Sequence, residues 1–452
     1  MNRRDFLKST AVVAPMILSR KTLGMTTPGP NDRVRIGLIG LGGRCNGLAR
    51  DVLRMEGVEI VAACDCFQPR LDSAMSSLGN EHGWTPYLDF REMMDKEQLD
   101  GVMAVTTTHA RAYVACHAMA AGLDVYIEKP MSLTIAEGRE MVNIARKYDR
   151  VTQVGSQQRS IPLNTWASDL VKNGALGKVH TVLAPNFMGP AYWTSNEEQE
   201  MPEGSNDGWW DIWTNQAVMR PYHQSLHRGW GLWWDYDGGG QSFGVTGWGT
   251  HSYDQINRGL GTDDTGPVEI TLDEALETRP SGTFEEREFG PEETGAPYYR
   301  MVWGSSGPRA AVRMRYENGT ELHLTEDADR APGLGCIFVG EKGRIEINRD
   351  AISSDVPELI QGEDHPGNLS LPENQPHIQN WIDCIRSRER CNADIEIGQR
   401  GTTLCYLVNI VREIGRVGET LHWDPVAERF TDCDEANLLL SRPRRAGFEL
   451  PA

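Results

Sequence analysis

The sequence predicts an α/β protein of two domains, the first with a doubly wound parallel sheet and the second with a large, mostly antiparallel sheet. From residue 33 to residue 155, short apolar segments that suit buried parallel strands alternate with helix-like segments. After residue 155 polar and apolar residues alternate within the strands, which is typical of antiparallel sheets. The chain of 452 residues is also too long for one small core.

The first domain begins with a strand that runs directly into a glycine turn. Residues 33–47 read RVRIGLIGLGGRCNG, in which Gly40 and Gly42 precede a helix. Bare glycine backbone lets a pyrophosphate approach, and the first N–H groups of the helix would bind it. Asp65 closes the next strand, 58–63, where a carboxylate meets ribose hydroxyls and repels the extra phosphate of NADP. The pattern therefore predicts an NAD site; a tight turn without a ligand is the alternative.

The other elements of the first domain follow from the same alternation. We expect strands at 101–105, 124–127 and 151–154, and helices at 70–77, 110–121 and 135–148. Thr134 and Glu137 form a capping box for the last of these helices. A parallel doubly wound sheet binds its ligand at the carboxyl ends of its strands. Glu128 and Lys129 follow strand 124–127 and are therefore expected on the cofactor side.

The second domain is predicted from period-two alternation and from tryptophan content. The expected strands are 179–183, 310–316, 321–325 and 344–347. Residues 192–248 are rich in tryptophan and glycine and are expected to form long loops over a substrate cleft. Adjacent pairs such as Trp209 and Trp210 cannot both point inward from one face, so some should line that cleft, with core packing as the alternative. Helical spacing at 378–385 and 404–411 predicts two helices packed on one face.

Two residues are candidates for acid–base chemistry. Oxidation of an alcohol needs a group that takes the hydroxyl proton while hydride leaves the same carbon for a nicotinamide ring. Lys129 is the first candidate, because an ammonium there would bind the hydroxyl and help its proton depart; a surface lysine before Pro130 is the alternative. His251 is the second, with Asp254 on the same helical face to orient its ring. A structural histidine is the alternative.

The N-terminus predicts export. Residues 2–8, NRRDFLK, and the apolar run 11–18 match the twin-arginine pattern, so we expect residues 1–31 to be a signal segment and the protein to be periplasmic. A basic disordered tail is the alternative. Because no nicotinamide pool exists outside the cytoplasm, an exported enzyme must retain its cofactor and regenerate it in place.

Charge and composition restrict the partners. A net charge of -19 repels nucleic acid and anionic membranes, which favours a neutral small-molecule substrate. No segment after the N-terminus is long or apolar enough to span a bilayer. The nine cysteines include no CxxC pair, and His223 and His227 have no third ligand at a telling spacing, so no metal site is expected.

Together the motifs resemble those of the Gfo/Idh/MocA oxidoreductases, particularly their exported twin-arginine branch. The resemblance rests on GLIGLGGR at 37–44, EKPM at 128–131, GSQQRS at 155–160, WDYDGGG at 234–240 with His251, GEKG at 340–343 and WDP at 423–425. It implies an NAD-binding Rossmann domain, 32–155, and an open-faced α/β domain, 156–452, that binds a sugar or polyol. In many relatives the open sheet pairs with a second copy, although no residue pattern here demands a homo-oligomer.

The resemblance also assigns roles to individual residues. Lys129 and His251 take the catalytic positions. The implied cofactor contacts come from Gly40, Gly42, Gly43, Arg44, Asp65, Thr106, His109, Glu128 and Lys129. The implied substrate contacts come from Arg159, Trp234, Asp235 and Asp254.

One departure from the family pattern is serious. Relatives carry an aspartate four residues before the catalytic histidine, where this sequence has Gly247, and their TPD-H stretch is altered to TTTH at 106–109. The missing carboxylate would work with the lysine and the histidine on the reacting hydroxyl. The candidates to replace it are Asp235, Asp237 and Asp254.

Three functions are consistent with the sequence. The first, which we favour, is an NAD-dependent oxidoreductase that acts on a sugar or polyol hydroxyl with a tightly held cofactor. The second is a redox-neutral NAD-dependent glycoside hydrolase or lyase, in which a ring hydroxyl is transiently oxidised, the aglycone is eliminated and the hydride is returned. The third is a non-catalytic sugar-binding protein, which Gly247 allows.

Overall fold

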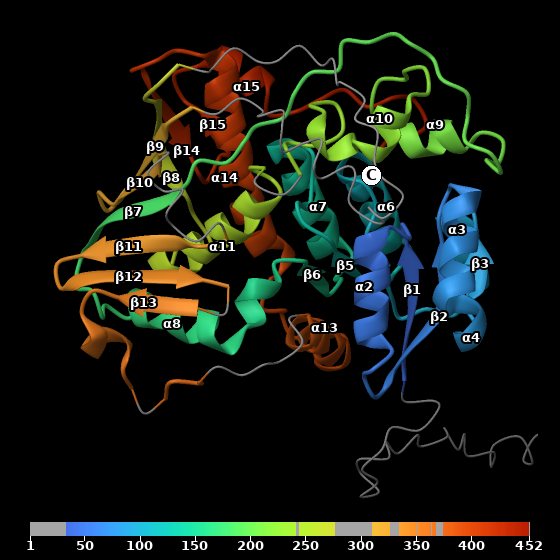
Figure 1. Ribbon diagram of the computed structural model, residues 1–452, viewed down its shortest axis with the longest axis horizontal. Helices are drawn as coiled ribbons and strands as arrows, with labels where there is room; N and C mark the ends of the chain where they lie inside the picture. The colour runs from blue at the N-terminus through green and yellow to red at the C-terminus, as the bar shows by residue number, and fades with distance from the viewer. Residues whose placement is uncertain are drawn as a thin grey trace, which may run out of the picture.

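The chain forms two sheets, seen at opposite sides of the molecule in the computed structural model (Figure 1). The structure describes residues 33–240, 244–275, 310–325, 334–349, 351–362, 364–367 and 374–451. The predicted signal segment, 1–31, lies outside the described residues. Within the described ranges, no helix has the length and apolar character needed to cross a membrane.

The first sheet has six strands, all parallel, in the order β3-β2-β1-β4-β5-β6 (Figure 1). The strands are β1 (Val34–Ile39), β2 (Val58–Cys64), β3 (Thr85–Tyr87), β4 (Gly101–Ala104), β5 (Asp124–Ile127) and β6 (Thr152–Val154). The strand order reverses between β1 and β4, and a doubly wound sheet binds its ligand at that switch point. The prediction of a doubly wound parallel sheet is confirmed; β3, only three residues long, was not predicted.

Helices cover both faces of this sheet. They include α2 (Gly43–Val52), α3 (Gln68–Ala74), α5 (Phe90–Lys96), α6 (Thr108–Ala120) and α7 (Ile135–Lys147). Val102 and Ala104 of β4 pack in one buried cluster and Met103 packs in another, as strand alternation requires. The predicted cap of α7 is present, since the side chain of Thr134 accepts a hydrogen bond from the backbone N–H of Glu137 at 3.2 Å.

The second sheet has nine strands in the order β13-β12-β11-β7-β10-β9-β8-β14-β15. The strands are β7 (Val179–Pro185), β8 (Pro267–Leu272), β9 (Val312–Tyr316), β10 (Glu321–Thr325), β11 (Cys336–Gly340), β12 (Gly343–Asn348), β13 (Ala351–Ser354), β14 (Thr420–Asp424) and β15 (Arg429–Phe430). Only the pair of β7 and β10 is parallel, so the prediction of a mostly antiparallel sheet is confirmed.

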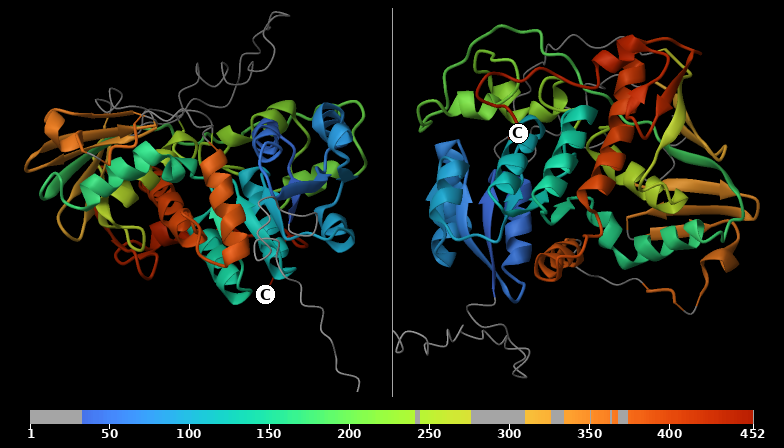
Figure 2. Two further views of the ribbon diagram at one scale, coloured as in Figure 1. Left: turned by 90° about the horizontal axis from the view of Figure 1, so that it is seen from below. Right: turned by 180° about the vertical axis from the view of Figure 1, so that it is seen from behind.

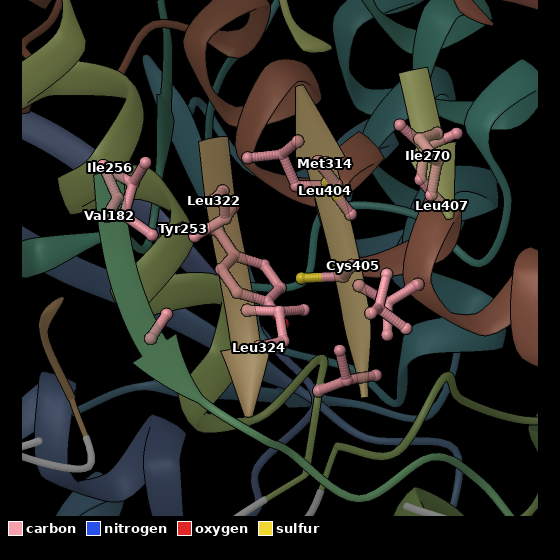
Figure 3. Close-up of a cluster of buried hydrophobic side chains, with 14 of the residues drawn as sticks. Val182, Tyr253, Ile256, Ile270, Met314, Leu322, Leu324, Leu404, Cys405 and Leu407 are labelled. Carbon is pink, nitrogen blue, oxygen red and sulfur yellow. The ribbon is translucent and has the colours of Figure 1, made fainter. Parts of the chain in front are cut away.

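One face of the second sheet packs against helices, including α8 (Pro162–Lys172), α11 (Trp248–Leu260) and α14 (Ile395–Ile414) (Figure 2). Figure 3 shows the side chains of α11 and α14, among them Tyr253 and Leu404, directed at apolar side chains of β7, β8, β9 and β10. On the other face β8 and β9 carry an ion pair, Arg315 with Glu269. Packing against α8, α14 and β7 therefore fixes the position of α11 on the sheet.

The helix α13 (Gln375–Ser387) packs against the first domain. Its Ile378, Trp381 and Ile382 lie in the same buried cluster as Ile36 of β1. Gly101 of β4 allows this, because a Cβ there would lie 3.1 Å from the Trp381 ring. The prediction that the two C-terminal helices pack on one face is therefore wrong: sequence spacing shows that a helix has an apolar face but not which core covers it.

Charged side chains also connect the two domains. Arg139 of α7 donates to Glu396 at the start of α14, at 2.6 Å, and to Glu428 after β14, at 2.9 Å. Near the C-terminus, which lies beside the first domain in Figure 1, Phe448 packs its ring 5.4 Å from that of Tyr113 on α6. These contacts hold α6 and α7 of the first domain against segments of the second domain.

Candidate active site

The glycine turn after β1 has the geometry of an anion cradle. Gly40 has a φ of +86°, and a Cβ there would lie 2.8 Å from the backbone N and Cα of Thr106. Gly42 is the N-cap of α2, and a Cβ on Gly43 would have no neighbour within 4 Å. Gly40 therefore allows the close crossing of β1 and β4, and the first N–H groups of α2, which has no side-chain cap, are available to bind a pyrophosphate.

Asp65 connects the end of β2 to this turn. Its carboxylate accepts hydrogen bonds from the backbone N–H of Leu41 at 2.8 Å and of Phe67 at 3.0 Å. Burial raises the pKa of Asp65, and nearby Arg70 opposes the rise. Arg70, whose guanidinium would lie 3.5 Å from a Cβ on Gly42, was not among the predicted cofactor contacts. A basic residue five positions after the expected ribose carboxylate was the sequence signal for it.

Glu128 and Arg44 meet at the carboxyl end of β5. Arg44, in the first turn of α2, donates to Glu128 at 3.1 Å and to the side chain of Asn374 at 3.2 Å. Gly155 leaves room for the carboxylate, because a Cβ there would lie 2.7 Å from Oε2 of Glu128. The structure thus brings Glu128 and Arg44 together beside the glycine turn, while their role in cofactor binding stays a prediction.

Lys129 is half-buried, and its Nζ donates to the backbone carbonyl of Gly247 at 3.2 Å. Burial lowers the pKa of Lys129; Glu128 opposes this, Arg44 adds to it and Asp237 opposes it. A buried amine that donates to a neutral carbonyl loses its proton more easily than one held by a carboxylate. Lys129 is therefore suited to accept a proton.

His251 lies on the first turns of α11, only 4% exposed. Burial lowers its pKa well below the usual value, and the positive charge of Lys129 adds to this effect. Its Nδ1 is buried and makes no hydrogen bond within the described residues. A neutral imidazole can donate a hydrogen bond from one ring nitrogen and accept one at the other, so His251 has the chemistry to bind a substrate hydroxyl.

Asp254 does not pair with His251 as predicted. Its carboxylate accepts hydrogen bonds from Nε of Arg159 at 2.7 and 2.8 Å, and Asp263 accepts from the same guanidinium at 2.5 and 3.1 Å. Arg159, in the short helix η3 (Gln157–Ser160), and Asp254 are both buried. The two predicted substrate contacts therefore bind each other and hold α11 against η3.

His109 packs in the interior. It is fully buried, its Nε2 bonds to the carbonyl of Trp213 at 2.8 Å, and its ring contacts those of Trp213 and Tyr236. We therefore assign His109 a packing role. Thr106, by contrast, lies at the switch point beside Gly40, and its carbonyl accepts a hydrogen bond from Arg111.

Trp234 and Asp235 each lie beside an arginine side chain. The guanidinium of Arg442 lies 4.5 Å from the Trp234 ring centre, and Tyr192 packs its ring at 5.8 Å. Asp235 accepts from Arg220 at 2.6 Å. Within the described residues neither side chain is hydrogen-bonded to Lys129, and their assignment to the substrate remains a prediction.

The tryptophan-rich region forms a packed aromatic cluster. Trp209 and Trp210, on α9 (Trp209–Thr214), are 2% and 6% exposed, so the expectation that adjacent tryptophans cannot both be buried is wrong. Their rings lie 5.4 Å apart, and Trp209 also contacts Phe67 at 4.4 Å. The buried residues of this short helix, Trp209, Trp210, Trp213 and Thr214, share one broad face, while Asp211 is exposed, so two adjacent tryptophans can both point inward. In the part of the chain that the structure describes, no three His, Cys, Asp or Glu side chains are placed to hold a metal ion.

Most of the chain matches one family. Residues 34–156 match the oxidoreductase family with an NAD-binding Rossmann fold, and residues 165–286 and 304–450 match its C-terminal α/β domain. The chain belongs to the Gfo/Idh/MocA oxidoreductases. Its first domain is an NAD-binding Rossmann domain, and the glycine cradle at α2 fits that cofactor.

Solved structures show the same fold. The WlbA dehydrogenase from Bordetella pertussis, in complex with NADH and UDP-GlcNAcA, is 15% identical with a TM-score of 0.59, over 88% of this chain and 99% of that one. The aldose-aldose oxidoreductase from Caulobacter crescentus, complexed with glycerol, is 17% identical with a TM-score of 0.56, over 86% and 99%.

Among curated proteins, a glycosyl hydrolase family 109 protein of Shewanella sp. (strain MR-4) is 27% identical over 175 residues. This match spans 33% of this chain and 38% of the length of that relative.

Proposed function

We propose that this protein oxidises a hydroxyl of a sugar or polyol, using NAD that it holds tightly, in the periplasm after twin-arginine export. The observation that supports this most directly is the hydrogen bond from Lys129, at the carboxyl end of β5, to the start of the helix that carries His251. The amine bonds to the carbonyl of Gly247, the N-cap of α11, and its positive charge lowers the pKa of the His251 imidazole. Lys129 and the glycine turn both lie at the carboxyl ends of parallel strands.

The residues would divide the work as follows. The N-terminus of α2 and Gly40 bind the pyrophosphate, and Asp65 lies at the adenine-side ribose. When bound, NAD supplies the acceptor for the hydride. A neutral Lys129 has two N–H groups and a lone pair: one N–H donates to the Gly247 carbonyl, and the lone pair takes the proton of the hydroxyl. His251 binds the hydroxyl without competing for that proton.

The aromatic cluster supports a tightly held cofactor. Phe67 and Gln68 lie two and three residues after Asp65. Phe67 packs among the tryptophans of the second domain, and the N–H of Gln68 donates to the side chain of Asn206 at 3.0 Å. A loop of the second domain is therefore packed against the segment that would hold the adenine-side ribose. Release of the dinucleotide along this side would require these buried contacts to open, which suits an enzyme that cannot draw on a pool of NAD.

A redox-neutral glycosidase is the second candidate, and the similarity to a glycosyl hydrolase family 109 protein favours it. In this reaction the oxidised ring carbon makes the neighbouring C–H acidic, the aglycone leaves, water adds and the hydride returns to the sugar. Lys129 and His251 would serve the same oxidation step. The two functions differ in whether the cofactor is left changed after one turnover.

The test uses the purified holoprotein and a panel of sugars and aryl glycosides. A lasting change in nicotinamide absorbance supports the oxidoreductase, and aglycone release with no net change supports the glycosidase. Binding without either would show a non-catalytic sugar-binding protein. Lys129→Ala is expected to abolish turnover while the nucleotide released by heating stays at the wild-type amount, and exposed Lys147→Ala is the matched control. Unchanged turnover in Lys129→Ala would remove this residue from the mechanism.

A further inference from the structure

Asp235, Asp237 and Asp254 are the candidates to replace the carboxylate that is absent at Gly247, and their bonding partners differ. Asp254 is bonded to Arg159, and Asp235 is bonded to Arg220. Asp237 is fully buried, and its two carboxylate oxygens accept hydrogen bonds from the hydroxyls of Thr108 and Thr246.

We propose that Asp237 is the positioning residue of Lys129: through Thr246 it holds the Gly247 carbonyl against the amine, and its charge helps to set how firmly that amine keeps a proton. This inference rests on the proposed function for its catalytic meaning. The contacts themselves do not depend on which substrate the enzyme uses.

A chain of hydrogen bonds from Asp237 fixes the position of the Gly247 carbonyl. Thr246 precedes Gly247, so the hydrogen bond from its hydroxyl to Asp237 fixes the residue next to the carbonyl that Lys129 reaches at 3.2 Å. Thr250, one turn into α11, donates its hydroxyl to the Thr246 carbonyl at 2.8 Å. Thr246 is thus held at both its side chain and its backbone, and Gly247 has little freedom to move away.

Asp237 also joins the two domains at the lysine. Thr108 begins α6 of the first domain, and its hydroxyl, which donates to Asp237, also accepts from Arg111 at 3.2 Å. Arg111 in turn donates to the carbonyls of Thr106, after β4, and Pro130, after β5. The same buried network therefore holds the backbone after Lys129 and the carbonyl that receives its N–H.

Asp237 also acts on Lys129 through its negative charge. The side chains that act on Lys129 come from five places: Glu128 beside it, Arg44 on α2, Arg111 on α6, His251 on α11 and Asp237. Cys405 on α14 also lies near, and burial raises the pKa of its thiol, so it carries no charge. Glu128 and Asp237 are the two negative groups in this set, opposite two arginines. Loss of the Asp237 charge would leave Glu128 alone to stabilise the ammonium.

Asp237 acts on Lys129 less directly than a carboxylate at position 247 would. A carboxylate side chain at 247 would bond the ammonium and hold its proton firmly. Here the ammonium bonds to the neutral Gly247 carbonyl, and the Asp237 carboxylate bonds to the preceding residue, Thr246. Burial raises the pKa of Asp237 itself, and the two threonine hydroxyls, Arg111 and Lys129 oppose the rise. Lys129 can therefore release its proton, while the negative charge of Asp237 still helps to stabilise its ammonium form.

The experiment measures the protonation of Lys129 without any substrate. Holoprotein is labelled with acetic anhydride across a pH series, and acetylation of the Lys129 peptide is followed by mass spectrometry. In Asp237→Asn we expect the midpoint to fall by about one pH unit, which is about tenfold faster labelling at a fixed pH below it. With an active sugar, the acidic limb of kcat/KM should move by the same amount.

Two further variants separate charge from geometry. Thr246→Val keeps the charge and removes the hydroxyl, so turnover should fall several-fold with the labelling midpoint unchanged; an equal midpoint shift would overturn the electrostatic half. Asp235→Asn should leave the midpoint at its wild-type value, and a shift there would make Asp235 the coupled residue. If folded Asp237→Asn labels as the wild type does, the proposal fails. Should no sugar turn over, the labelling result still decides the role of Asp237 while the proposed function alone falls.

Discussion

Replacement of Gly40 by alanine tests the cofactor cradle at its tightest point. The residue has a φ of +86°, a conformation that costs an L-residue about 1–2 kcal/mol. The new Cβ would lie 2.8 Å from N and Cα of Thr106 and 2.9 Å from the carbonyl carbon of Val105, all of them backbone atoms. Because backbone cannot rotate aside, overpacking adds about 1–3 kcal/mol. The sum, about 2–5 kcal/mol, falls on the turn that would hold the pyrophosphate.

We therefore expect Gly40→Ala to melt several degrees lower than the wild type and to purify with little nucleotide. The assay is a thermal melt together with the nucleotide released by heating. Gly47→Ala is the matched control, because Gly47 lies on α2, just after the glycine turn, and a Cβ there has no neighbour within 4 Å. Alanine at this position should stabilise the helix by about 0.5–1 kcal/mol. Wild-type melting and full nucleotide content in Gly40→Ala would refute the steric reasoning.

Two further predictions concern buried charge. Arg159→Ala should destabilise the fold by about 3–5 kcal/mol, since it leaves buried Asp254 without its cation, while Arg315→Ala on the outer face of the second sheet should barely change the melting temperature; equal effects would contradict the role given to burial. Burial and two nearby arginines lower the pKa of His227 to about 3, so its stabilising contribution is present above about pH 6.5 and is lost as the pH falls toward 3. Between pH 7 and 5 this site should cost about 2 kcal/mol, and His227→Phe should flatten that part of the melting profile; an identical profile would show that His227 titrates normally.

Local sequence signals predicted much of the first domain. The strand β5 was expected at its observed bounds, and the Thr134 cap began the expected helix, because strand periodicity and capping depend on residues close together in the chain. The glycine turn and Lys129 were found for the same reason: each is defined by its place at the end of a strand.

Other features depended on partners more than 100 residues away. Sequence spacing could not show that α13 packs on the first domain or that Trp209 and Trp210 are both buried in one aromatic cluster. The short strands β3 and β15 also have too few residues for a periodic signal.

The sequence by itself determined the family, the two domains' sheet types and the lysine at the switch point, since these are written in contiguous motifs. Only the tertiary structure decided which charges meet. Asp254 and Arg159 are 95 residues apart, and Asp237 and Thr108 are 129 apart, and each pair is joined only because both members are buried at the same place. A buried carboxylate must find a cation or hydroxyl donors, and packing of the two domains determines which of these lie within reach.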